Sequence, residues 1–406
     1  GQGPSRHAGL LDNVTDFDPG HFLIRQEDAE AMDPQAFLLL EESLAVLHHA
    51  GYTTKEMKGR STGVYVGARS HHRPSPDALA QARNPIVAVG PNYLAANISQ
   101  FFDLRGPSLM IDTACSSALV GMQMAVQALQ AGDIESAIVG GVCVLPEEAY
   151  ALFAQRNLLS ESAEFHVLDR RAQGLVLGEG IAMVMLKTVE QALRDGDTIH
   201  AVIKGIATNN DGRTAGPATP NLLAQKAVMQ QALDRSGHRP QDVRYIHVNG
   251  SGSEVTDLLE LKALEAVYRT AADAGVPCEL GSMEPNIGHP LCAKGIAAFL
   301  QVVLMLSRRR SVPFLSGQEP MTHYDIDASP FHFGRAASPW ASSQHLAAIN
   351  CFADGGTNAH VILQAWEAPA GSHGTRKPVP MPTLNRRSVR HKQQPKAAAA
   401  MGGWPV

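Results

Sequence analysis

The feature that most constrains the fold is a set of short, uninterrupted apolar runs separated by helical segments. Residues 137–145 are the clearest case, and residues 63–68, 181–186 and 200–207 are of the same kind. These runs are rich in valine and glycine and lack the polar alternation of a half-exposed strand, which is typical of strands buried on both faces. Helical segments alternate with them along the chain. The sequence therefore predicts a layered α/β fold.

One cysteine lies where two such elements meet. The octet Asp112-Thr-Ala-Cys115-Ser-Ser-Ala-Leu119 joins a predicted strand, residues 107–112, to an apolar helix, residues 118–129. A cysteine at the start of a buried helix meets unpaired amide groups and the helix dipole, which favour a thiolate and can hold an oxyanion. The octet alone also fits a small core residue between apolar segments. Cys115 is thus a candidate nucleophile whose role depends on the other motifs.

Composition argues against several classes of function. The chain has 406 residues and a net charge of −5, which gives no support to nucleic-acid binding. No apolar run approaches the roughly 20 residues of a membrane span. The five cysteines are irregularly spaced without a CxxC pair, and no HExxH pattern is present. We therefore expect no disulfide framework, no metal site and no membrane contact, and a location in the reducing cytoplasm.

A change of composition predicts a domain boundary near residue 366. Residues 1–366 carry the alternating elements, and two strand–turn–helix halves, one with Cys115 and one with Asn249 and His289, indicate a duplicated core. Residues 367–406 hold prolines, an alanine run and a basic cluster of Arg376, Lys377, Arg386, Arg387, Arg390, Lys392 and Lys396. Such a segment is typical of a solvated linker or tail, and a nucleic-acid-binding tail is the alternative.

The octet closely resembles the active-site signature of the ketosynthase domains of modular type I polyketide synthases. Other segments match that family in order and spacing over about residues 9–365. They are Met32-Asp-Pro-Gln35, Gly106-Pro-Ser108, Gly140-Gly141, Gly178-Glu-Gly180, Asn210-Asp-Gly-Arg213, Asn286-Ile-Gly-His289 and Gly356-Thr-Asn-Ala-His360. The resemblance implies a thiolase-like fold with a duplicated five-layer αβαβα core. The family begins with a further strand and helix, so we expect that the N-terminus is truncated here.

The resemblance also implies partners. It implies a homodimer that works with upstream and downstream acyl carrier proteins and with other domains of a polyketide synthase. The acyl chain would arrive on the 4'-phosphopantetheine arm of a carrier, and no tightly bound cofactor is expected.

Two positions depart from the family pattern. Where the family resembles Tyr-Val-Glu-Ala-His-Gly-Thr-Gly-Thr, this chain has Tyr245-Ile-His-Val-Asn249-Gly-Ser-Gly-Ser253, so Asn249 replaces the first active-site histidine. Glu284 replaces a lysine five residues before the second histidine, which is retained as His289. Asparagine donates a hydrogen bond but cannot move a proton, and loss of a positioned acid–base group costs roughly 10²–10⁴-fold in rate. We expect a carboxylate at 284 to favour the imidazolium form of His289 and to repel a malonyl carboxylate, unless Glu284 lies on the surface.

Further roles follow from the resemblance. The backbone amides of Cys115 and Phe352 are expected to hold the oxyanion, with Phe352 also a gate or, alternatively, a core residue. Gly355, Ser251 and Ser253 are further candidates for substrate binding. Glu179 is expected to be a buried charge whose usual partner is the lysine missing at 284. Glu179 and Glu284 would then both be unpaired, and one would have a raised pKa.

Another histidine near Asn249 is a possible replacement. His247 lies two residues earlier, about 6.5 Å along a regular strand. This offset is too large for its imidazole to take the place of the missing one without a change of register.

These observations predict a non-elongating ketosynthase, which takes an acyl chain onto Cys115 and passes it to another carrier without adding carbons. One alternative is a slow elongating synthase that uses His289 alone. Another is a non-catalytic scaffold that dimerises and docks carriers, although a scaffold has no chemical need for a nucleophile in an intact octet. Cysteine proteases also pair Cys with His and Asn, but the order of the motifs is that of condensing enzymes.

Overall fold

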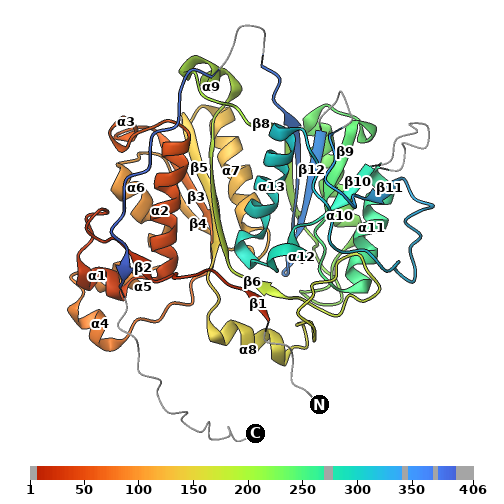
Figure 1. Cartoon of the computed structure of the whole chain (residues 1–406), viewed down its shortest axis with the longest axis horizontal. Helices are drawn as coiled ribbons and strands as arrows, with labels where there is room; N and C mark the ends of the chain where they lie inside the picture. Colours follow the sequence, from red (N-terminus) through yellow and green to blue (C-terminus); the bar gives the residue numbers. More distant parts are fainter. Residues whose placement is uncertain (1–6, 269–277, 341–345, 369–373, 390–406) are drawn as a thin grey trace, which may run out of the picture.

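Two mixed β-sheets face one another with helices between them (Figure 1). The structure is a computed structural model that describes residues 7–268, 278–340, 346–368 and 374–389. The first sheet has the order β4 (Ser108–Ile111), β3 (Thr62–Gly67), β5 (Ser136–Cys143) and β7 (Gly180–Leu186). The second has the order β11 (Phe331–Phe333), β10 (Cys278–Gly281), β9 (Val243–His247), β12 (Leu346–Phe352), β13 (Thr357–Ala365) and β8 (Ala201–Asn210). Strand β7 is antiparallel to β5, and β13 is antiparallel to both of its neighbours.

Helices form the other three layers. Between the sheets, α7 (Ser117–Ala131) packs on β3 and β5, and α13 (Lys294–Arg308) packs on α7, β7 and β12. Helices α2 (Pro34–His49) and α6 (Tyr93–Phe102) cover the outer face of the first sheet, and α10 (Leu222–Ser236) and α11 (Glu254–Tyr268) that of the second (Figure 1). This order confirms the predicted thiolase-like αβαβα fold.

Shorter elements surround these layers. β1 (Ala8–Gly9) pairs with β6 (Leu177–Gly178), and β2 (Asp16–Phe17) pairs with β14 (Arg387–Ser388). The short helices are α1 (Gln26–Ala31), α3 (Thr54–Met57), α4 (Pro76–Gln81), α5 (Pro85–Val89), α8 (Glu147–Gln155), α9 (Val189–Asp195) and α12 (Glu284–Ile287), with 3₁₀ turns η1 (Pro240–Asp242) and η3 (Leu291–Ala293).

Two glycines bring the central helices close to their neighbours. A Cβ atom on Gly67, at the end of β3, would lie 2.5 Å from the backbone nitrogen of Ala118 in α7. A Cβ atom on Gly295, in the first turn of α13, would lie 2.8 Å from the Leu119 side chain. The first turns of α7 and α13 therefore pack directly on each other, next to Cys115 and Lys294.

One stretch has the length and apolarity of a membrane span, which the sequence pattern does not predict. Leu291–Arg308 has a mean hydropathy of 1.5 over 18 residues. More than half of it is buried inside the protein, because α13 lies between the two sheets. Its composition is therefore that of the central core helix.

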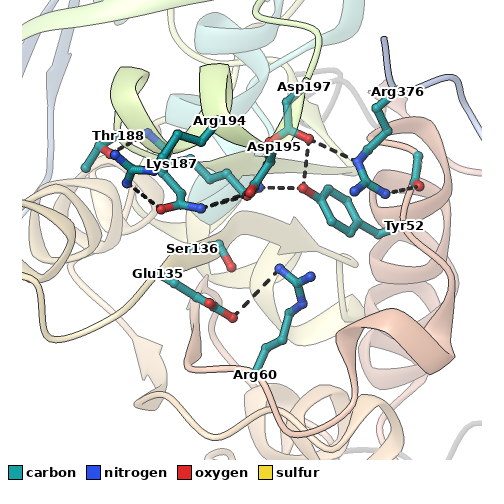
Figure 2. Close-up of polar contacts among 12 residues, drawn as sticks. Tyr52, Arg60, Glu135, Ser136, Lys187, Thr188, Arg194, Asp195, Asp197 and Arg376 are labelled. Atoms are coloured by element: carbon teal, nitrogen blue, oxygen red, sulfur yellow. Dashed lines mark hydrogen bonds and ion pairs between the residues drawn. The ribbon is translucent and has the colours of Figure 1, made fainter. Parts of the chain in front are cut away.

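The segment beyond the predicted boundary returns to the domain, which the sequence does not predict. The Arg376 guanidinium lies 4.0 Å from the centre of the Tyr52 ring and pairs with Glu56 at 3.1 Å. Figure 2 shows Tyr52 between Arg376 and Lys187. The Lys187 ammonium also contacts the carboxylates of Asp195 and Asp197.

Further along this segment, more side chains contact the domain. Arg386 pairs with Glu41 at 2.8 Å, Arg387 donates to Gln26, and Val389 is buried. These arginines of the predicted solvated linker are thus bound to the domain. Arg390, Lys392, Lys396 and the alanine run lie outside the described residues, and the boundary at 366 stays a prediction.

Candidate functional site

Cys115 lies on a tight turn between β4 and α7. The preceding residue, Ala114, has a φ of 54°, a left-handed conformation that costs energy for any residue but glycine. The Ser117 hydroxyl fixes the turn, because it accepts from the N–H of Thr113 at 2.9 Å and donates to the Ala114 carbonyl. On the opposite side, the Cys351 thiol donates to the Cys115 carbonyl at 3.1 Å. The turn holds the Cys115 side chain in one place beside β12.

The environment of the thiol differs from the one predicted. Burial raises the pKa of Cys115, and this outweighs the positive charge of Lys294 and the backbone amides of Asp354 and of Cys115 itself, which lower it. The expectation that the helix N-terminus would make the thiolate the favoured form is therefore wrong. Because the thiolate is the nucleophile, the cation beside it matters for reactivity.

His289 is a neutral hydrogen-bond donor. Its Nδ1 accepts from the backbone N–H of Leu291 at 3.2 Å, so the ring hydrogen is assigned to Nε2. Burial lowers the pKa of His289 well below its usual value, and the charge of Lys294 lowers it further. The expectation that Glu284 would favour the imidazolium is therefore wrong. His289 can offer an Nε2–H to a developing oxyanion but carries no charge.

The Asn249 carboxamide is held by two donors. Its Oδ1 accepts from Lys294 Nζ and from the N–H of Phe352, both at 2.9 Å. The backbone amides of Asn249 and Gly250 donate to the buried Glu260 carboxylate at 2.6 and 2.9 Å. The predicted oxyanion pair of Cys115 and Phe352 amides is thus not free in this arrangement, since the Phe352 amide is engaged by Asn249. The Asn249 Nδ2 has no bonding partner among the described residues and is available as a donor.

The ion pair behind Asn249 is the feature that the sequence does not reveal. Lys294, which is 1% exposed, also donates to the Asn249 carbonyl at 2.5 Å and lies 3.3 Å from the fully buried Glu284. Burial raises the pKa of Glu284 to about 7, while Lys294 opposes the rise. The alternative of a surface position for Glu284 is therefore wrong. The one available signal was a lysine within the apolar run of residues 293–303.

Glu179 and Glu284 are not the unpaired carboxylates that the sequence predicts. Glu179 accepts from the N–H groups of Leu11 and Leu145 at 2.9 and 2.8 Å, far along the chain from Glu284. Glu284 has Lys294 as its partner and also accepts from the Ser282 hydroxyl. Burial is the main cause of the raised pKa of Glu284. The prediction that one of the two carboxylates has a raised pKa is therefore right, but the predicted cause, the lack of a partner, is wrong.

The other candidate residues shape the loops around the site. The Ser251 hydroxyl and amide both donate to Asp257, and the Ser251 hydroxyl accepts from the N–H of Ser253. Gly355 has a φ of 92°, and its carbonyl accepts from Asn210. Their roles in substrate binding stay predictions.

His247 does not replace the missing histidine, as expected from its register. It is fully buried, its Nδ1 contacts the Val248 carbonyl at 3.1 Å, and its Nε2 accepts from the N–H of Met283 at 3.2 Å. Both ring nitrogens are thus used within the fold. The ranges that the structure describes contain no cluster of three side chains suited to a metal ion.

Comparison with known proteins agrees with this geometry. Residues 1–192 match the β-ketoacyl synthase N-terminal domain, and residues 200–318 match the β-ketoacyl synthase C-terminal domain. The oxazolomycin ketosynthase domain OzmH KS8 of Streptomyces albus JA3453 is 50% identical, with a TM-score of 0.80 over 94% of this chain and 92% of that one. The chain belongs to the ketosynthases of modular polyketide synthases.

Two further relatives support the assignment of this ketosynthase. Polyketide synthase PksL of Bacillus subtilis strain 168 is 56% identical over 389 residues, which is 96% of this chain and 8% of PksL. The ketosynthase from module 6 of the bacillaene synthase of Bacillus subtilis 168 is 32% identical, with a TM-score of 0.82 over 89% of this chain and 64% of that one. This ketosynthase spans less than a tenth of the length of PksL.

Proposed function

We propose that this ketosynthase takes an acyl chain from one acyl carrier protein onto Cys115 and passes it to another without decarboxylative condensation. The observation that carries the proposal is the Asn249 carboxamide, whose Oδ1 is fixed by Lys294 and the Phe352 amide where the family resemblance places a histidine. A residue held in this way can donate a hydrogen bond but cannot take up or release a proton.

The transfer is a thioester exchange that needs no second reactant. The Cys115 sulfur bonds to the acyl carbon, the bond from that carbon to the carrier's pantetheine sulfur breaks, and the cysteine proton ends on the departing sulfur. The same steps in reverse load the second carrier. The ketosynthase is regenerated with its thiol protonated.

Condensation asks more of the site. Loss of carbon dioxide from a malonyl thioester leaves an enolate that needs positioned donors. Of the two imidazoles that the family resemblance places at the site, this chain keeps one, His289. Loss of a single oxyanion donor costs about 10²–10³-fold in rate, and loss of acid–base catalysis costs roughly 10²–10⁴-fold. The smaller figure is enough to let acyl transfer outpace condensation.

The proposed setting is a polyketide synthase in the cytoplasm. A homodimer of the ketosynthase would work between an upstream and a downstream carrier, each with a 4'-phosphopantetheine arm, and beside other domains. The relatives that are named polyketide synthases support the polyketide synthase part of this setting.

Intact-protein mass spectrometry tests the proposal. Incubation with an acyl-pantetheine thioester should add one acyl group, Cys115→Ala should remove the label, and the buried Cys278→Ala should keep it. A holo-carrier added afterwards should receive the acyl group. If malonyl-carrier instead yields a β-ketoacyl product two carbons longer, the protein is an elongating synthase. If no covalent adduct forms, it is a scaffold.

A further inference from the structure

The buried ammonium of Lys294 contacts the residue that stands in for the histidine. We propose that Lys294 is a positioning residue of the acyl-transfer site, which fixes the Asn249 carboxamide in one orientation and supplies the permanent positive charge that keeps the Cys115 sulfur reactive. The proposal rests on acyl transfer at Cys115 and holds whether or not condensation also occurs.

The contacts of Lys294 leave it little freedom. Its Nζ donates to both oxygens of Asn249, the carbonyl at 2.5 Å and Oδ1 at 2.9 Å, and lies 3.3 Å from Glu284 Oε1. With Phe352 as the second donor to Oδ1, the carboxamide cannot rotate without losing two hydrogen bonds. Its Nδ2–H₂ therefore stays as the side that can donate to a substrate oxygen.

Lys294 is also the main cation near the nucleophile. The charged or titratable groups that interact electrostatically with the Cys115 thiol include Arg69, Cys143, Cys292, Lys294, Cys351 and Asp354. Burial raises the pKa of the three other cysteines, so that these thiols are neutral at pH 7. Arg69 forms a bidentate pair with Asp112 at 2.7 and 2.9 Å, which offsets its charge.

The ammonium keeps its proton throughout the transfer. Burial lowers the pKa of Lys294, but Glu284 and the other anionic groups around it raise the pKa by more, to above its usual value. During loading, the thioester carbon gains a bond to Cys115 sulfur and loses its bond to the carrier sulfur, which takes the proton. Lys294 stabilises the thiolate before this step by its charge and gives up nothing.

The pH dependence of Cys115 alkylation by iodoacetamide tests the proposal without any acyl substrate. Removing the counter-charge with Glu284→Gln should leave Lys294 as an uncompensated cation and move the alkylation profile to lower pH. Removing both charges with Glu284→Gln/Lys294→Met should move the profile to higher pH by at least about one unit relative to Glu284→Gln, because an opposite charge nearby typically shifts a pKa by 1–3 units. At pH 7.5 the double variant should then react about tenfold more slowly than Glu284→Gln.

Two comparisons decide the outcome. Lys58→Met removes an exposed lysine and should leave the profile unchanged, and circular dichroism should show native folding for each variant. If Glu284→Gln does not move the profile, or if the double variant matches it, Lys294 has no influence on the thiol and the proposal is overturned. Because neither result depends on malonyl-carrier, failure here is distinct from failure of the proposed function.

Discussion

Lys187 and Lys294 both have nearly inaccessible side chains, but their surroundings differ. Lys187, with 6% of its side chain exposed, contacts Asp195 and Asp197 at 2.6 Å each and also donates to the Tyr52 hydroxyl. Lys294 has a single carboxylate partner, Glu284, at the longer distance of 3.3 Å. The first cluster reaches solvent through its aspartates, whereas neither member of the second pair does.

This difference indicates that Lys187 has a structural role and that Lys294 influences the reacting groups. Burial lowers the pKa of Lys187, but its hydrogen bonds to two carboxylates and to Tyr52 raise it more, so its charge is fully matched by neighbours. The partner of Lys294 is Glu284, whose pKa is about 7, so Glu284 neutralises the positive charge of Lys294 only in part near neutral pH. The ammonium also donates a hydrogen bond to Asn249 and lowers the pKa of Cys115. A matched cluster ties segments together, while a partly matched cation can act on a nearby reacting group.

The largest predicted effect comes from breaking the ion pair of Lys294 and Glu284. Lys294→Met should lower the free energy of unfolding at pH 8 by about 3–5 kcal/mol, because it leaves Glu284 as a fully buried carboxylate without its cationic partner. Urea denaturation followed by circular dichroism measures this. Lys187→Met should cost less, about 1–2 kcal/mol, because Asp195 and Asp197 remain partly solvated and Asp197 still pairs with Arg376.

The double variant Glu284→Gln/Lys294→Met serves as the control. It removes the buried charge as well and should recover most of the lost stability. Equal losses for the two single lysine variants would contradict the distinction between the clusters.

A second prediction concerns how stability depends on pH. Glu284 has an ordinary pKa of 4.5 and a pKa of about 7 in the folded protein, so folding favours its protonated form. Its contribution to stability is fully present below pH 4.5 and is lost as the pH rises through 7. At about 1.4 kcal/mol per pKa unit, the wild type should lose about 3 kcal/mol relative to Glu284→Gln between pH 5 and pH 8.

Denaturation curves across this pH range measure the difference. The exposed Glu190→Gln, in the first turn of α9, should run parallel to the wild type. Parallel curves for Glu284→Gln as well would show that Glu284 titrates normally, and the asymmetry between the two lysine clusters would then disappear.

The fold could be predicted from the sequence because its signals are local and repeated. Valine- and glycine-rich runs such as residues 137–145 indicate buried strands, and the position of Cys115 before an apolar helix follows from adjacent residues. His289 and Asn249 could be assigned because each lies within a motif of fixed spacing. The spacing of His247 and Asn249 along a regular strand stays a prediction, because β9 ends at His247.

The charges of the site could not be predicted, because they depend on contacts between distant segments. Lys294 lies 45 residues from Asn249 along the chain, and it belongs to a helix whose sequence is typical of an apolar core helix. Without it, Glu284 looked like a repulsive charge beside His289, when it is the partner of a lysine. The direction of the Cys115 pKa shift could not be predicted for the same reason, because burial by the rest of the fold outweighs the helix N-terminus that the sequence does show.

The smallest predicted effect concerns the returning segment at the well-matched cluster. Arg376→Ala removes the contact with the buried Tyr52 ring and the pairs with Glu56 and Asp197, which should cost up to about 1 kcal/mol because the Arg376 side chain is partly exposed. The loss should be local. Hydrogen exchange should quicken at amides such as that of Val379, which donates to the His48 carbonyl at 2.7 Å, while labelling of Cys115 stays unchanged. The neighbouring, exposed Lys377→Ala should alter neither quantity. Slower labelling in Arg376→Ala would mean that this cluster communicates with the active site, and the division between a structural and a chemical lysine would have to be abandoned.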